Sequence, residues 1–268
     1  MYGLDFNGCA GVDKRSVDTW LEPNIFRMDV GVGSPPDAFD PNGQNWGFPS
    51  YNWDAMEKDG YAWWQSRLRH MAQYFSAFRV DHILGFFRIY EIPAIHATGA
   101  LGRFRPSRPL TKAQLEGLGI WDLNRLCEPY ITSEIITEVL GDLAHTATAL
   151  YLVETETGRF ALKPAYANET NILAITPRAG SPDWMVKEVQ ATVKGLLKLR
   201  QNVVLLRDEK DSQRFYPRFH LMETSSFAAF DQSKHAILTD LHDCYFFHNH
   251  GEMWRANALK TIPVLMQV

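Results

Sequence analysis

The chain is poor in cysteine, in clustered positive charge and in long apolar runs, and each scarcity excludes a class of protein. Its three cysteines, Cys9, Cys127 and Cys244, are far apart and odd in number. This argues against a disulfide framework and for a reducing compartment, the cytoplasm. No apolar run reaches the roughly 18 residues of a membrane span, and the first residues lack a basic segment followed by an apolar one. We therefore expect a soluble protein without a targeting segment.

Charge and composition narrow the set of partners. A net charge of -4 and the lack of a Lys and Arg run argue against binding to nucleic acid or to a membrane surface. Aromatic residues make up 13% of the chain, with eight Trp, and several stand among Gly, Asn and Asp. Sugars present apolar faces and polar rims, so this mixture is typical of carbohydrate sites.

The stretch Phe-Arg-Val-Asp-His-Ile at residues 78–83 reads as a short buried strand that ends in polar residues. Residues two apart in a strand share a face, so Arg79 and Asp81 project together. A guanidinium within a few ångströms keeps a carboxylate ionised, and such an anion can attack a carbon atom. Taken alone, the fragment favours a simpler interpretation, a structural ion pair at the end of a strand.

A loop rich in Gly and Pro, residues 33–49, precedes this strand. That density of Gly and Pro excludes a helix or a central strand. A loop of this length in a compact domain is functional or disordered, and its aromatic residues argue against disorder. Residues 40–43 resemble a calcium-binding loop faintly, but the alternating ligand spacing is missing, so we expect no metal there.

Between this loop and the Asp81 strand, residues 61–75 have the apolar spacing of an amphipathic helix whose stripe faces a core. The helix leads directly into the strand that bears Asp81. This order is typical of α/β units, in which catalytic groups lie at the carboxyl end of a parallel strand. We expect residues 86–93 to begin the loop and helix that follow.

The pattern of apolar residues changes from Thr98 to about Asn249, where helical spacing dominates. A short helix is predicted to begin near residues 110–112, and apolar residues continue at helical spacing from Ile135 to Leu150. Ser181 is predicted to cap a further helix that has Pro182 at its first position. We therefore expect a largely helical segment here.

Several of these motifs occur together in one family. Residues 43–49 (Gly-Gln-Asn-Trp-Gly-Phe-Pro), 35–37 (Pro-Pro-Asp) and 79–82 (Arg-Val-Asp-His) resemble, in order and spacing, the amylomaltase family of 4-α-glucanotransferases, the disproportionating enzymes of glycoside hydrolase family 77. The similarity runs through residues 11–93. The long segment at 98–249 resembles an insertion of the plant-type cytosolic disproportionating enzyme, the branch that uses maltose.

The resemblance implies a fold and a division of the chain. The fold would be α/β, part of a (β/α)8 TIM-type barrel with a large, mainly helical insertion. Residues 1–97 would be a barrel segment with the nucleophile strand and the glucan-binding loop. Residues 98–249 would be the insertion, and residues 250–268 would return to the barrel before its acid/base strand.

The resemblance also implies residue roles in a retaining transfer. Asp81 would be the nucleophile, Arg79 would keep it ionised and oriented, and His82 would hydrogen-bond the sugar. The further residues implied to contact the glucan are Gln44, Asn45, Trp46 and Asp37. Donor and acceptor would be α-1,4-glucans, with maltose or maltooligosaccharides as donors, and the reaction would need no metal or cofactor.

Other features of the sequence leave alternatives to an active glucanotransferase. In the relatives a strand with the acid/base glutamate follows the last helix, and no such strand precedes Val268. We therefore expect the 268-residue chain alone to be inactive, and a truncated, glucan-binding product is the main alternative. A hydrolase of the α-amylase clan would lack the Gly-Gln-Asn-Trp-Gly loop. Asn7 stands where the family has an aspartate, or else residues 1–10 are foreign to the family.

One cluster has potential metal chemistry: His242, Cys244, His248 and His250. Cys244 and His248 would share a helix face, but His242 and His250 would not join them, and no Cys-x-x-Cys supports a site. We therefore predict no metal site in the chain.

Overall fold

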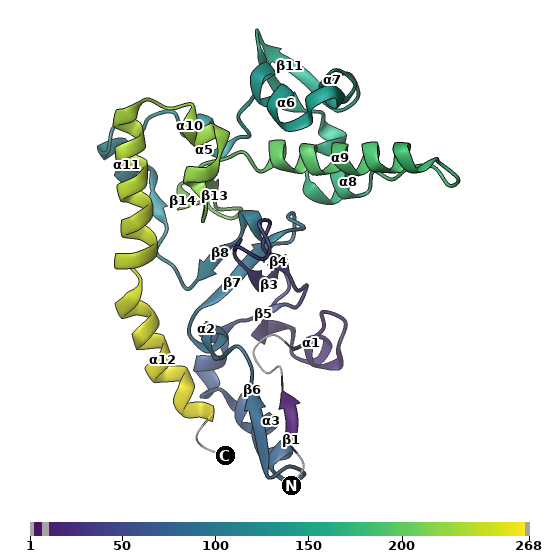
Figure 1. The fold of residues 1–268 in the computed structure, drawn as a ribbon. Helices are drawn as coiled ribbons and strands as arrows, with labels where there is room; N and C mark the ends of the chain where they lie inside the picture. The colour runs from purple at the N-terminus through teal and green to yellow at the C-terminus, as the bar shows by residue number, and fades with distance from the viewer. Residues whose placement is uncertain (1–2, 7–10, 266–268) are drawn as a thin grey trace. The chain divides into compact units, whose positions relative to one another are not determined.

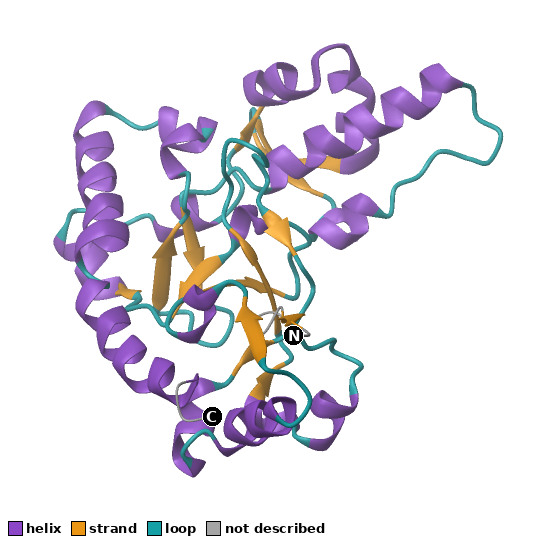
Figure 2. Cartoon of the chain, turned by 60° about the horizontal axis from the view of Figure 1, so that its bottom comes forward, coloured by secondary structure: helices purple, strands orange, loops and turns teal. Residues whose placement is uncertain are grey.

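The computed structural model describes residues 3–6 and 11–265, which divide into two compact units. Unit 1 takes the described residues of 1–94, 102–108 and 244–268, and unit 2 takes 95–101 and 109–243. Both units mix helices with strands (Figure 2), which confirms a mixed helix and sheet protein. In the described part of the chain the strands form separate sheets of two to four strands and no closed barrel. The predicted substitution at Asn7 lies outside the described residues.

The elements are numbered in chain order (Figure 1). The strands of unit 1 are β1 Gly3–Phe6, β2 Phe26–Arg27, β3 Val30–Ser34, β4 Gln44–Asn45, β5 Ser50–Tyr51, β6 Ala77–Val80, β7 Ile89–Pro93 and β8 Arg103–Arg105. Its α-helices are α1 Val17–Leu21, α2 Trp53–Met56, α3 Ala62–Ala72 and α12 Gly251–Leu265. Shorter helical turns are η1 Pro23–Ile25, η2 Glu57–Asp59, η3 Ile83–Phe86 and the π-helical Cys244–His248.

Unit 2 contains more helix. Its α-helices are α4 Lys112–Gly117, α5 Leu123–Cys127, α6 Ser133–Leu140, α7 Ala144–Tyr151, α8 Glu169–Leu173, α9 Asp183–Arg200, α10 Ser225–Ala228 and α11 Gln232–Asp243. Its strands are β9 Leu110–Thr111, β10 Ile131–Thr132, β11 Leu152–Glu156, β12 Arg159–Leu162, β13 Leu205–Arg207 and β14 Arg214–Pro217. None of the described helices combines the length and the apolar character needed to cross a bilayer.

The centre of unit 1 is an antiparallel sheet in the order β4-β3-β7-β8. The prediction that residues 86–93 begin a loop and a helix is wrong, because Ile89–Pro93 form β7. Every residue of β7 is buried, and its β-branched and aromatic side chains suit a strand paired on both edges. The prediction that residues 33–49 contain no central strand is wrong at Gly33. This residue belongs to β3 and pairs with β4 on one side and β7 on the other.

The strand before Asp81 lies apart from this sheet. β6 pairs in parallel with β1, with Phe6 opposite Val80, and Figure 1 shows the two strands side by side. Helix α3 precedes β6, so the predicted helix and parallel strand are confirmed, although α3 is shorter than residues 61–75. The prediction of a buried strand fails at Ala77 and Arg79, which are exposed, while Val80 is half-buried. In the described chain β6 has a single strand neighbour.

Aromatic packing holds unit 1 together. Trp64 and Leu68 of α3 are buried, as their helical stripe predicts. Trp64 packs against Phe86 with ring centroids 4.9 Å apart and stacks on Trp53 at 6.4 Å. Part of the aromatic excess therefore builds the core, where each large ring buries about 150–250 Å².

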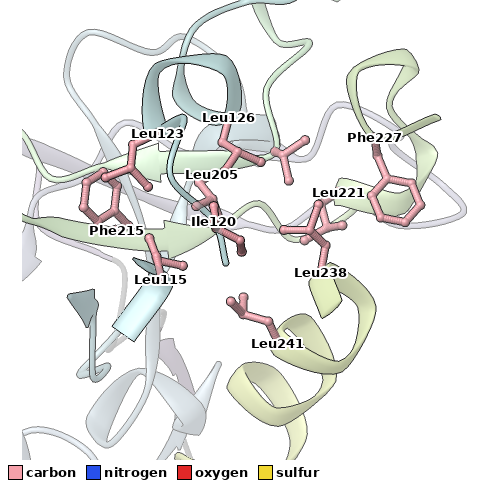
Figure 3. Close-up of a cluster of buried hydrophobic side chains, with 11 residues drawn as sticks. Leu115, Ile120, Leu123, Leu126, Leu205, Phe215, Leu221, Phe227, Leu238 and Leu241 are labelled. Atoms are coloured by element: carbon pink, nitrogen blue, oxygen red, sulfur yellow. The ribbon is translucent and has the colours of Figure 1, made fainter. Parts of the chain in front are cut away.

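Unit 2 has two apolar clusters. One joins α4, α5, α10, α11 and the β13-β14-β9 sheet (Figure 3), with Leu123 and Phe215 among its eleven buried side chains. The other packs α6 and α9 against the β10-β12-β11 sheet. The helix predicted near residues 110–112 is confirmed as α4, where Thr111 and Gln114 form a capping box.

One helix prediction in unit 2 is confirmed and one is wrong. The helical spacing from Ile135 to Leu150 is confirmed as two helices, because Gly141, with φ of 53°, separates α6 from α7. Glycine enters this left-handed region without a Cβ clash, so the chain turns there. Ser181 is not the cap of α9; Pro182 occupies that position, with no side-chain hydrogen bond.

His250 is a buried base in unit 1. Its Nε2 accepts a hydrogen bond from the Arg108 amide at 2.9 Å, so Nδ1 carries the proton that is donated to the Tyr245 carbonyl at 2.5 Å. The ring stacks on Trp254 at 5.3 Å. Burial is the main cause that lowers the pKa of His250 from its ordinary 6.5, the nearby Arg108 charge lowers it further, and the Tyr245 carbonyl acts in the opposite sense. The fold therefore requires a neutral imidazole.

This burial predicts a loss of stability in mild acid. Below about pH 6.5 the unfolded chain protonates His250 while the folded chain does not, so the free energy of unfolding falls with pH by up to about 1.4 kcal/mol per unit. Urea unfolding at pH 7.5 and 5.5 measures this loss. His250→Gln should remove part of the pH dependence, whereas His145→Gln, at an exposed position, should leave it unchanged. Equal pH slopes in wild type and His250→Gln would contradict the assignment.

Candidate functional site

Arg79 and Asp81 flank the end of β6 and contact each other. Arg79 Nη2 lies 3.4 Å from Asp81 Oδ1, and the two side chains are 66% and 49% exposed. The contact is longer than a typical N–H···O bond of about 2.9 Å. A solvent-exposed pair of this kind contributes about 0–1 kcal/mol. The pair therefore adds little to stability, and it leaves the Asp81 carboxylate open to a ligand.

The backbone turns sharply just after Asp81. His82 has φ of 50° and ψ of 52°, the left-handed conformation. Non-glycine residues seldom adopt it, and the strain costs on the order of 1–3 kcal/mol. The turn starts the short helix η3 and brings the His82 ring against Trp46 of the loop, with centroids 5.4 Å apart and planes at 87°. The strand end and the predicted glucan-binding loop therefore meet at this pair.

His82 lies beside charges of both signs. Burial is the largest cause that lowers its pKa, the Asp81 carboxylate raises it, and the Arg88 guanidinium lowers it. The pKa falls below its ordinary 6.5, so the ring is neutral at pH 7 and carries one donor and one acceptor nitrogen. Such a ring can exchange hydrogen bonds with sugar hydroxyls.

Hydrogen bonds within the loop fix the other predicted contact residues. Trp46 Nε1 donates to Gln44 Oε1 at 3.0 Å, and Gly47 N donates to Asn45 Oδ1 at 3.0 Å. Gln44 is exposed, and Asn45 and Trp46 are half-buried. The loop therefore presents amide and indole groups at the surface from a fixed backbone.

Asp37 has a local role in the same loop. Its Oδ1 accepts hydrogen bonds from the amides of Phe39 and Asp40, both at 2.8 Å, while its own amide donates to the Asp40 carbonyl at 3.0 Å. These bonds close a turn of the kind that Asp side chains favour. Its predicted contact with glucan stays a prediction.

Two glycines of β3 support the loop, and the sequence interpretation missed them. A Cβ at Gly33 would lie 1.9 Å from the Gln44 carbonyl oxygen, and one at Gly31 would lie 2.7 Å from Asn45 Oδ1. Only glycine allows β4 to approach this closely. The Val-Gly-Val-Gly alternation at residues 30–33 was the available signal, because glycine inside a strand often marks a close backbone approach.

Two histidines of the predicted histidine and cysteine cluster have their ring nitrogens engaged in hydrogen bonds. Both ring nitrogens of His250 are engaged, and His242 contacts the Phe219 carbonyl at 2.8 Å and the Asp243 carboxylate at 3.0 Å. Among residues 3–6 and 11–265, no three His, Cys, Asp or Glu side chains are grouped to hold a metal ion. In the segment 40–43, which faintly resembles a calcium-binding loop, Asp40 Oδ1 accepts a hydrogen bond from the Asn42 amide at 3.0 Å.

The end of β6 and the loop of residues 43–49 thus bring together an open carboxylate, a guanidinium, a neutral imidazole, amides and an indole. Comparison with known proteins gives the family. A family model described as 4-alpha-glucanotransferase, glycoside hydrolase family 77, matches residues 9–257. This chain belongs to that family.

Individual relatives agree with this assignment. The chain is 46% identical to 4-alpha-glucanotransferase DPE2 of Oryza sativa subsp. japonica over 256 residues, 96% of this chain and 27% of the relative. A 4-alpha-glucanotransferase of Streptococcus pneumoniae is 41% identical over 135 residues, 47% of this chain and 26% of the relative. The chain thus spans about a quarter of the length of these curated relatives. The rice alignment takes in most of residues 98–249, as the resemblance to the plant-type enzyme predicts.

A solved structure is also similar. The amylomaltase from Streptococcus agalactiae in complex with acarbose is 29% identical, and the similarity covers 39% of this chain and 21% of that chain with a TM-score of 0.35. A TM-score this low does not support a fold assignment.

Proposed function

We propose that the chain carries the nucleophile and part of the glucan-binding groove of a 4-α-glucanotransferase. The substrates would be α-1,4-glucans, with maltose or maltooligosaccharides as donors. The observation that carries the proposal is the meeting of His82 and Trp46 immediately after Asp81. This meeting supports a functional site because His82 has a strained backbone conformation there. Such strain clusters at functional positions.

The proposed reaction is a retaining double displacement. An Asp81 carboxylate oxygen attacks the anomeric carbon of the donor, and the bond to the leaving O4 breaks with its electron pair going to that oxygen. A second carboxylic acid, which we assign to no residue of this chain, protonates the leaving oxygen. The acceptor hydroxyl then loses its proton to that carboxylate and attacks the same carbon, and the Asp81 ester breaks to restore the carboxylate.

The contacts at the site support separate roles. Asp81 is half-exposed, so a sugar can reach it, and the Arg79 guanidinium at 3.4 Å favours its anionic form. Neutral His82 would hydrogen-bond the sugar held there. Trp46, with its Nε1 already held by Gln44, would offer its face to a glucosyl ring, while Gln44, Asn45 and Asp37 would contact hydroxyls.

The fold and location that go with this activity are also proposals. We propose that unit 1 is part of a (β/α)8 barrel, since β1 and β6 pair in parallel and α3 precedes β6. Residues 98–249 would be its insertion. We propose the cytoplasm as the compartment, because three widely separated cysteines argue against a disulfide framework and for a reducing environment. The alternative is a glucan-binding protein without catalysis, which the same groove would serve.

We expect Trp46→Ala to weaken binding of maltoheptaose to the 268-residue chain. Loss of a stacking face worth about 1 kcal/mol corresponds to about fivefold in Kd. Isothermal titration calorimetry measures this change. Trp20→Ala is the matched control, because Trp20 is 82% exposed and lies on α1 outside the loop. Unchanged affinity in Trp46→Ala would assign Trp46 to packing against His82 only.

A further inference from the structure

We propose that unit 2 carries a second, non-catalytic site that binds a neutral α-glucan on the face of Trp121. The ligand class rests on the proposed function, whereas the site itself rests on the geometry of unit 2. Trp121 lines a cavity of about 250 Å³ together with polar residues of α4, α5, β13 and the loop before β14.

Trp121 is held with its side chain in solvent. Its neighbours Ile120 and Leu123 are 6% and 9% exposed and belong to the core in Figure 3, whereas Trp121 is 71% exposed. The Leu123 amide donates to the Trp121 carbonyl at 3.1 Å. The backbone is thus anchored on both sides of an indole that contributes little to the core. An exposed aromatic side chain on an anchored backbone is a ready platform for a sugar ring.

The rest of the lining suits hydroxyl groups. Arg207 Nη2 donates to Asn124 Oδ1 at 2.9 Å, and its guanidinium lies 5.4 Å from the Phe215 ring. These contacts hold the Arg207 fork in the lining of the cavity. Gln213, exposed beside it, adds a further amide. Amide and guanidinium groups can hydrogen-bond two neighbouring sugar hydroxyls at once, because each offers more than one hydrogen-bonding group in a plane.

Charge and size favour a neutral saccharide over an anionic ligand. The lining carries Lys112 and Arg207 against Glu116 and Asp122, so the formal charges balance. Lys112 Nζ already lies 3.6 Å from Glu116 Oε1, which leaves no excess cation for a phosphate. The cavity is smaller than the roughly 300–1,000 Å³ of pockets for drug-sized ligands. It therefore suits one or two sugar rings of a longer chain.

The test compares Trp121 with the predicted groove in one assay. Maltoheptaose is titrated into wild type, Trp121→Ala, Trp121→Tyr and Trp46→Ala forms of the 268-residue chain, with binding heat and circular dichroism as readouts. Trp121→Ala should weaken the Trp121 component by about fivefold without a change in melting temperature, and Trp121→Tyr should retain most of it. Trp184→Ala is the matched control, because Trp184 of α9 is 58% exposed and lies outside the cavity lining.

The outcomes separate this site from the proposed function. Both sites would be supported if Trp121→Ala weakens binding but leaves a second binding component, and if Trp46→Ala removes that second component. Loss in Trp121→Ala alone would support the second site and count against the groove. If Trp121→Ala binds as wild type does, or if Trp184→Ala weakens binding equally, the second site is refuted, whatever Trp46→Ala does.

Discussion

Asp81→Asn is expected to reduce glucan transfer by about a thousandfold or more, because it removes the proposed attacking anion at nearly constant volume. The assay incubates the longest natural form of the protein with maltotriose and follows glucose and longer maltooligosaccharides by chromatography. Stability should change little, because the Arg79 and Asp81 side chains are 66% and 49% exposed and such pairs contribute about 0–1 kcal/mol.

The chain supplies a matched control for this substitution. Arg105 and Asp54 form another exposed pair in unit 1, with Arg105 Nη2 and Asp54 Oδ2 3.3 Å apart. Asp54→Asn breaks a contact of the same kind and length as the Asp81 contact but lies outside the site. It should retain transfer activity. A comparable loss in both variants would mean that Asp81 acts through stability and not through chemistry.

Gly33→Ala is expected to damage both the fold and the proposed glucan-binding loop. The added Cβ would lie 1.9 Å from the Gln44 carbonyl oxygen and 2.6 Å from Ile92 Cδ1, so β4 must move away from β3. Overpacking of this kind costs about 1–3 kcal/mol in the free energy of unfolding. Because Gln44 and Asn45 form β4, maltoheptaose affinity should fall along with stability.

Gly117→Ala gives the opposite control. Gly117 ends α4, and a Cβ there meets no atom within 4 Å. Alanine should therefore leave stability unchanged or raise it by up to about 1 kcal/mol. Thermal and urea unfolding compare the two variants, and calorimetry compares their binding. Equal stability of Gly33→Ala and wild type would show that β4 can shift without cost, and the support for the loop would be misassigned.

The sequence predicts the local chemistry of this protein better than its long-range pairing. The stripe of Trp64 and Leu68 identified α3, and alternation placed Arg79 and Asp81 on one side, because both patterns depend on neighbours in the chain. Their contact at 3.4 Å agrees with that alternation. The roles of Asp81 and its neighbours in catalysis remain predictions that rest on the family.

The features that sequence interpretation missed depend on partners distant in the chain. Ile89–Pro93 become a strand because β3, some sixty residues earlier, offers a paired edge. Gly33 matters because of Gln44, which the hairpin folds back onto it. The run from Ile135 to Leu150 keeps helical spacing across Gly141, so its periodicity alone could not reveal the break between α6 and α7 at this positive-φ glycine.

The most direct test of the central claim is to trap the covalent intermediate on Asp81. A fluorinated glucosyl fluoride, whose fluorine slows breakdown of the glycosyl ester, is incubated with the longest natural form of the protein, and the digested peptides are analysed by tandem mass spectrometry. We predict one fluoroglucosyl unit on the Asp81 carboxylate and none in Asp81→Asn. A glycosyl ester on any other carboxylate, with Asp81 unmodified, would contradict the account.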